Sequence, residues 1–154
     1  MSYKRAVITM LVMAVLLAAA CGGGRSTAAS GARQASNPPA GTPKLDPAVS
    51  MPSGFPADVP IYPGARLTAA ASFTGTGQTT WGMNWETSDS VPIVQAFYSS
   101  KLSQADWKIS VTGSNSTAFT ATFNRKSNSK SGGILAADAS SGVTRITMSL
   151  ASAT

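Results

Sequence analysis

From residue 67 onward, apolar and polar residues alternate along most of the chain, which is the pattern of strands in a sheet with one buried face. The alternation predicts strands at about 67–74, 81–86, 107–111, 118–125 and 143–150, with a short further strand at 134–136. The glycine-rich segment Thr74-Gly75-Thr76-Gly77 between the first two strands predicts a hairpin turn.

Residues 90–104 interrupt this alternation. Val94, Phe97, Leu102 and Ala105 recur there at helical spacing, so this segment predicts the one helix. Asp89 or Ser90 is expected to cap its first turn, where Pro92 is tolerated because the first N–H groups of a helix have no helical partner.

These elements predict an α+β domain with an antiparallel sheet of about five strands and one helix packed on one face. The expected order is ββαβββ, or ββαββ with an added edge strand. The covered face would hold the core, and its bulk is expected from Phe73, Trp81, Trp85, Phe97, Trp107, Phe119 and Phe123. The other face is expected to expose Thr68, Ser72, Thr80, Asn84, Glu86, Lys108, Ser110, Thr120, Thr122, Asn124, Thr147 and Ser149.

Order is expected to begin near Phe55, where apolar residues appear between prolines. Phe55, Ile61 and Tyr62 are predicted to lie across the domain and to close one end of the core. The alternative interpretation of these side chains is an aromatic strip that binds sugar.

The first residues have the three parts of a secretory signal. Lys4 and Arg5 form a basic start, an apolar run follows from Ala6 to about Leu17, and Ala18, Ala19 and Ala20 precede Cys21, the only cysteine. The run Leu17-Ala18-Ala19-Ala20-Cys21 resembles the lipobox of bacterial lipoproteins, although its leucine lies one place further from the cysteine than is usual. The resemblance implies diacylglyceryl transfer to Cys21, cleavage before it and acylation of the new amino terminus. Two alternatives stay open: a single-pass anchor, and plain secretion that leaves a free thiol at Cys21.

The predicted domain organisation therefore has three parts. Residues 1–20 are a signal peptide, 21–53 contain the lipidated Cys21 and a disordered tether rich in Gly, Ala, Ser and Pro, and 54–154 form a single α+β domain. The predicted location is the extracytoplasmic side of the cell membrane. An outer membrane is an option, because Gly22 stands where inner-membrane lipoproteins commonly carry aspartate.

Three short motifs resemble a domain of uncharacterised bacterial lipoproteins and secreted proteins. They are the run Asp58–Ala65, the Phe97-Tyr98 pair with Leu102, and the Asp106-Trp107 pair, and the likeness covers about 55–150. The resemblance implies structural roles for these motifs, and it implies neither a reaction nor catalytic residues.

The composition limits the chemistry of the chain. It contains no histidine and one cysteine, which excludes Ser-His-Asp triads, histidine-ligated metals, disulfides within the chain and CxxC redox chemistry. Ser127 and Lys130 fit an S-x-x-K spacing, but they lie in a hydrophilic loop where that chemistry is not expected. We expect no enzyme activity, no metal and no cofactor.

The net charge is +6, from 12 basic and 6 acidic residues, without the basic and aromatic interleaving of nucleic-acid binders, so nucleic acid is not an expected partner. The leading functional hypothesis is a membrane-anchored binding or interaction module for an envelope protein or a cell-wall glycan. Its candidate binding residues are Thr80, Asn84, Glu86, Thr120, Thr122 and Asn124 on the open face. The alternatives are a structural accessory subunit of an envelope complex and a hydrolase of unrecognised type.

Overall fold

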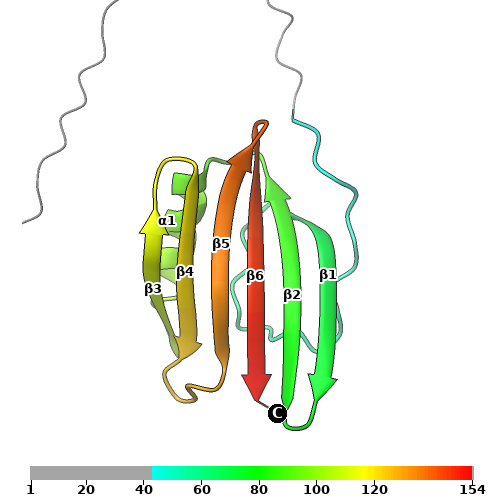
Figure 1. The fold of residues 1–154 in the computed structure, drawn as a ribbon, viewed down its shortest axis with the longest axis vertical. Coiled ribbons are helices and arrows are strands. Elements are labelled where there is room, and N and C mark those ends of the chain that lie inside the picture. The colour runs from blue at the N-terminus through cyan, green and yellow to red at the C-terminus, as the bar shows by residue number, and fades with distance from the viewer. Residues whose placement is uncertain (1–42, 154) are drawn as a thin grey trace, which may run out of the picture. The chain divides into compact units, whose positions relative to one another are not determined.

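A computed structural model describes residues 43–153, which contain one antiparallel sheet and one helix (Figure 1). The elements are β1 (Arg66–Gly75), β2 (Gln78–Thr87), α1 (Val91–Lys101), β3 (Trp107–Ser114), β4 (Ala118–Arg125), β5 (Gly132–Ser140) and β6 (Val143–Ala153). The strands lie side by side in the order β1-β2-β6-β5-β4-β3. Within residues 43–153 no helix has the length and apolar character needed to cross a membrane.

The antiparallel α+β architecture with one helix is confirmed, but the expected strand number is wrong: the sheet has six strands. The short strand expected at 134–136 is the nine-residue β5, and it lies inside the sheet between β4 and β6. Its glycines and alanines weaken the alternation that marks a strand. The two glycines of β5 let the neighbouring strands approach closely. A Cβ on Gly133 would lie 1.8 Å from the backbone oxygen of Ser149, and a Cβ on Gly132 would lie 2.4 Å from the backbone oxygen of Phe123.

A bulge near the start of β1 changes which side chains face the core. Leu67 pairs with Trp85. Ala69 pairs with Asn84, the neighbour of Trp85, so Thr68 is an extra residue without a partner on β2. From there on the faces are exchanged relative to simple alternation: Ser72 lies opposite Trp81 on the core side. The placement of Phe73 in the core is therefore wrong, because its side chain is 75% exposed on the open side. The placement of Ser72 on the open face is wrong for the same reason. Thr68 is the bulged residue itself, and its half-buried hydroxyl donates to the Asn84 carbonyl at 3.4 Å.

The helix is shorter than the sequence predicts. It begins at Val91, ends at Lys101, and buries Val94 and Tyr98. Ser90 is its N-cap residue but makes no side-chain capping bond. Asp89 has another partner, because its carboxylate accepts a hydrogen bond of 2.7 Å from the Tyr62 hydroxyl.

Two pieces of the chain share the cover of one sheet face. The helix lies against β4 and β5, and the segment before β1, residues 43–65, packs beside it. Phe55 meets Trp81 and Trp85 edge-on, with ring centroids 6.1 and 6.4 Å away. Tyr62 is buried and its ring centroid lies 5.2 Å from that of Phe97, which links the segment to the helix.

Part of the segment predicted as tether also lies on the sheet. The Val49 N–H donates to the Leu67 carbonyl at 2.8 Å, next to the edge of β1, and Pro43 lies beside Gly142 in the β5–β6 turn. The ordered part of the chain therefore includes residues 43–53. The signal sequence, Cys21 and the rest of the predicted tether lie outside the described residues.

Two glycines test the packing of the strands. We expect Gly133→Ala to lower the free energy of unfolding by about 2–3 kcal/mol or more, because its methyl group would overlap the Ser149 backbone. Gly82→Ala is the matched control, since a Cβ there meets nothing within 4 Å, and we expect a change within about 0.5 kcal/mol. Urea unfolding of both variants measures this, and equal stability of the two would contradict the β5–β6 register.

Candidate functional site

The helix and the aromatic side chains of the segment before β1 lie against one face of the sheet. The other face, called the open face below, is covered at one corner, where Asp46 meets Glu86. By strand register it carries Ala69, Ala71, Phe73, Thr80, Gly82, Asn84, Lys108, Ser110, Thr120, Thr122, Asn124, Ile134, Ala136, Thr147 and Ser149. Most of these side chains are small, and Lys108 is the charged one among them. A further row on the same side, at the end of the sheet opposite Lys108, is charged and consists of Arg66, Glu86, Arg145 and Asp138. The open face is therefore a surface of hydroxyls, methyl groups and glycine with a row of mixed charge at one end.

Its central row crosses all six strands. Direct cross-strand partners bring Ala71, Gly82, Ser149, Ile134, Thr122 and Ser110 into one line from β1 to β3. Ile134 is 53% exposed in the middle of this surface. It gives the row an apolar centre flanked by the hydroxyls of Ser149 and Thr122.

Five of the six candidate binding residues lie on this face. Thr120 and Thr122 are exposed on β4, and Thr80 is exposed on β2. Asn84 and Asn124 are half-buried, and the Asn124 amide donates to the Arg125 carbonyl at 2.9 Å. The structure thus places the candidates in two groups, with β5 and β6 between them.

The sixth candidate, Glu86, is not free to bind a partner from solution. Its side chain faces away from the core, yet the residue is only 4% exposed. The backbone N–H of Asp46 donates to its Oε2 at 2.8 Å, and Arg145 donates to its Oε1 at 3.4 Å. The expectation that Glu86 is exposed is wrong, because the segment before β1 covers it.

Two apolar members of the open face, Phe73 and Ile134, were missed in the sequence. The bulge at Thr68 that turns Phe73 outward has no sequence signal of its own. Ile134 follows two glycines at the end of a polar stretch, so the sequence predicted a short strand at 134–136 and gave no sign that this strand is central. Strand β5 pairs with β4 on one side and β6 on the other, and only this pairing shows that Ile134 lies on the open face.

A polar cluster joins three distant parts of the chain at one end of the sheet. The Trp107 indole N–H donates to both the carbonyl and the carboxylate of Asp58, at 3.2 Å each. Arg125 donates to the same carboxylate at 2.8 Å, and its guanidinium carbon lies 4.4 Å from the centroid of the Trp107 ring. This arrangement ties the segment before β1 to β3 and β4, as expected for structural motifs.

Asp106 extends this cluster into the β4–β5 loop. Its carboxylate accepts bonds from the N–H and the hydroxyl of Ser127, and Arg125 lies 3.4 Å away. These bonds, with those from Ser127 as the larger cause and Arg125 adding to them, lower the pKa of Asp106. The Ser127 hydroxyl is thus occupied as a loop anchor, and Lys130 lies exposed in the same loop.

Large side chains fill the space between the sheet and its cover. Trp81, Met83, Trp85, Tyr98, Leu135 and Met148 are each at most 4% exposed. Residues 43–153 enclose no detectable pocket, and they bring together no group of three potential metal ligands. Burial raises the pKa of the Tyr98 phenol, and burial together with the bond to Asp89 raises that of Tyr62 to about 12.

Comparison with known families gives one partial similarity. A family model described as START domain-like matches residues 67–132, which run from β1 to the first residue of β5. The match covers less than half of the chain and leaves out β6. No curated protein and no solved structure matches the sequence.

The polar cluster predicts that neither alanine nor lysine can replace Arg125 without a loss of stability. We expect Arg125→Ala to destabilise the domain by about 1 kcal/mol, since it removes an ion pair, partly exposed and therefore weakened by solvent, and a stacked cation. Arg125→Lys is expected to recover little of this loss, because lysine lacks the planar fork that reaches two carboxylates and stacks on Trp107.

Thermal or urea unfolding measures both changes, with Lys108→Ala as the control because Lys108 is exposed on β3. Hydrogen exchange of the segment around Asp58 gives a second readout. An Arg125→Ala variant that unfolds like the Lys108→Ala control and keeps the same exchange in this segment would contradict the role of the cluster.

Proposed function

We propose that this protein is a lipid-anchored lipoprotein of the bacterial cell envelope whose domain is a non-enzymatic binding module. In this proposal Cys21 carries the anchor, and the open face meets a macromolecular partner, an envelope protein or a cell-wall glycan. The observation that carries it is the bare open face, with five of the candidate binding residues and an exposed apolar centre at Ile134.

The dimensions of the open face suit a macromolecular partner. Six strands at about 4.8 Å span roughly 25–29 Å, and eight residues at about 3.3 Å per residue give a similar height. The product is on the order of 650–770 Å², which is close to what one partner contributes to a standard protein interface. A surface of this size and flatness fits another flat or extended surface.

The composition of the face lowers the cost of binding. Ala, Gly, Ser and Thr side chains have few rotamers to lose, so covering them costs little conformational entropy. Ile134 and Phe73 supply apolar area that gains free energy when a partner removes it from water. The hydroxyls of Thr120, Thr122 and Thr80 supply hydrogen bonds that fix orientation.

The START-like match supports a binding role of some kind, since it suggests a ligand-binding module with a helix-grip arrangement of sheet and helix. The location of the site is argued from packing instead. Trp81, Trp85 and Tyr98 occupy the space between sheet and helix, where a small ligand would otherwise lie. The outer surface of the sheet is the larger area available for recognition.

Photo-crosslinking in the host cell tests this proposal. We expect a photoreactive residue at Thr122 or at Thr80 to give the same discrete adduct, because both side chains are exposed on the open face. Ile93, which is 55% exposed on α1, is the control position and should not give that adduct. Ile134→Glu should reduce the yield at Thr122, since it places a charge in the apolar centre of the contact.

An adduct formed at Ile93 but at neither Thr122 nor Thr80 would contradict the use of the open face. The melting temperature of the Ile134→Glu variant is measured in parallel. Ile134 is more than half exposed, so we expect the fold to survive the substitution.

A further inference from the structure

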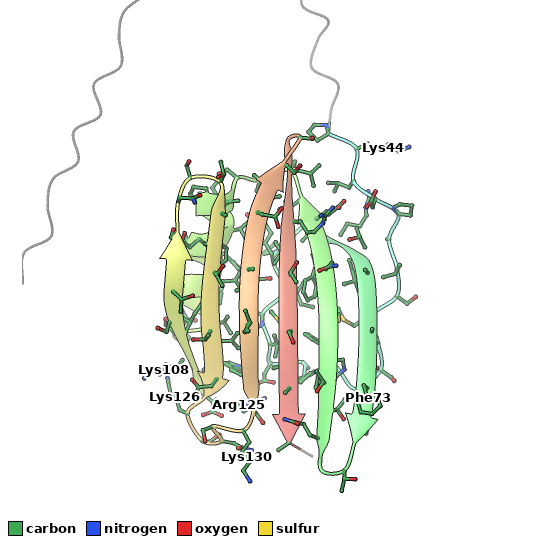
Figure 2. All side chains as sticks on the ribbon, in the orientation of Figure 1. Lys44, Phe73, Lys108, Arg125, Lys126 and Lys130 are labelled. Carbon is green, nitrogen blue, oxygen red and sulfur yellow. The ribbon has the colours of Figure 1, made fainter. Side chains whose placement is uncertain are left out.

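Charged residues are distributed unequally between the two ends of the sheet. One end, called the basic end below, is formed by the α1–β3 turn, the β4–β5 loop and the part of the segment before β1 bonded to them. It carries five basic residues, Lys101, Lys108, Arg125, Lys126 and Lys130, and two acidic ones, Asp58 and Asp106. The opposite end carries three basic residues, Lys44, Arg66 and Arg145, and four acidic ones, Asp46, Glu86, Asp89 and Asp138. Figure 2 shows Lys108, Arg125, Lys126 and Lys130 together at one end, with Lys44 at the other.

Backbone bonds fix the members of the basic end. The Lys126 N–H donates to the Asp106 carbonyl at 2.7 Å, and its Nζ donates to the Ala105 carbonyl at 2.7 Å. Lys101 lies in the same turn, because its carbonyl accepts from the N–H of Gln104. The lysines therefore come from three separate elements that are held against one another.

The two acidic residues of this end are already engaged. Asp58 accepts from Arg125 and Trp107, and Asp106 accepts from Ser127 and Arg125. None of the four lysines forms an ion pair with an acidic residue between residues 43 and 153, and all four are exposed. Their charge is available to an anionic partner.

An exposed aromatic side chain lies toward the same end. Phe73 and Lys108 belong to one transverse row of the open face, which runs through Thr80, Ala151, Gly132 and Asn124. Phe73 is 75% exposed, the most of any large hydrophobic side chain in the described residues. Phe73 and Lys108 lie on the two edge strands, about 24 Å apart by five strand spacings, so the ring and the lysines are separate points at the same end of the sheet. Both kinds of side chain suit a membrane interface, where ammonium groups meet anionic headgroups and an exposed ring enters the acyl boundary.

We infer that the basic end contacts the anionic lipid surface of the membrane in which the protein is anchored, and so sets the orientation of the domain. This inference rests on the lipid anchor of the proposed function. Polybasic segments are attracted to anionic leaflets within about one Debye length, roughly 8 Å at physiological salt. The anchor holds the domain close enough for this weak, short-range attraction to act.

The chain length allows this orientation. The described chain begins at Pro43, beside Gly142 at the end opposite the basic end, so the connection from Cys21 must pass the height of the sheet. The 11 residues of β6 correspond to about 36 Å. About 20 residues separate Cys21 from Pro43, and they span at most about 70 Å when fully extended. With the basic end on the lipid, the strands stand upright and the open face is presented sideways to a partner.

Quenching by nitroxide headgroup lipids measures this orientation in the full-length lipidated protein. Ser129→Cys places a fluorophore in the loop of the basic end, and Ser140→Cys places it at the opposite end of β5. In phosphatidylcholine vesicles with about 30% phosphatidylglycerol, we expect clearly stronger quenching at position 129 than at 140. The difference should disappear in pure phosphatidylcholine and at about 1 M salt, where the Debye length falls to about 3 Å.

Charge variants provide the second arm. Lys126→Gln with Lys130→Gln should reduce the membrane-facing population by roughly fivefold for each lysine removed. Lys44→Gln, at the opposite end, is the matched control and should leave the quenching unchanged.

Equal quenching at the two positions, or quenching that does not depend on anionic lipid, overturns the inference while leaving the proposed function intact. Intact-mass analysis of the same sample reports the lipid on Cys21. Its absence overturns the anchor and with it this inference.

Discussion

A six-stranded sheet is too wide for one 11-residue helix to cover, and this constraint decides how the rest of the domain is built. The sheet spans roughly 25–29 Å across its strands, whereas a helix with its side chains is about 10–12 Å wide. The helix lies over β4 and β5, so the apolar faces of β2 and β6 need another cover. Residues 43–65 provide it, and Phe55 packs on Trp81 and Trp85 where the helix does not reach.

The extended segment at residues 43–65 has no helical hydrogen bonds of its own, so its position depends on hydrogen bonds to the sheet. The Asp46 N–H bonds to Glu86 near one end of the sheet, and Asp58 bonds to Trp107 and Arg125 near the other. Between Asp46 and Asp58 along the chain, Phe55 packs on Trp81 and Trp85, and after Asp58 Tyr62 is buried against Phe97. Both sets of hydrogen bonds use side chains of the strands. Glu86 therefore holds the segment in place and is not available to a partner from solution.

Because the helix and the segment before β1 both pack on one face of the sheet, most of the open face remains exposed. Exposed strands with large apolar side chains invite aggregation, and the open face instead carries mostly alanine, glycine, serine, threonine and asparagine, with charged residues in its end rows. The exceptions, Ile134 and Phe73, are the places where the domain leaves apolar area in water. Four of the five lysines between residues 43 and 153, none of which forms an ion pair, are likewise collected at one end. The open face and the basic end together define the surfaces through which the proposed function would act.

The sequence was informative wherever side chains were large and their spacing regular. Trp81, Met83 and Trp85 predicted β2 and its buried face, and the spacing of Val94 with neighbouring apolar residues predicted the helix. The sequence was uninformative where small residues form a strand, or where backbone geometry decides which face a side chain lies on. The glycines before Ile134 suggested a loop because nothing local reveals that Ser149 and Phe123 leave no room for a Cβ. The bulge at Thr68 reversed the faces of β1, and the role of Glu86 depends on Asp46, which lies 40 residues away.

The central claim is that the open face is occupied by a partner in the cell. Thiol reactivity tests it without knowledge of the partner, in variants with one introduced cysteine at Thr122 or Ser149, with a cysteine at the exposed Ile93 as reference. A membrane-impermeant maleimide is applied to intact cells and to purified protein, and the parent chain, whose one cysteine is Cys21, gives the background. The account predicts that the two open-face cysteines react more slowly in cells than in the purified protein, while the cysteine at position 93 reacts equally in both. Equal reactivity of all three in cells and in the purified protein would contradict it.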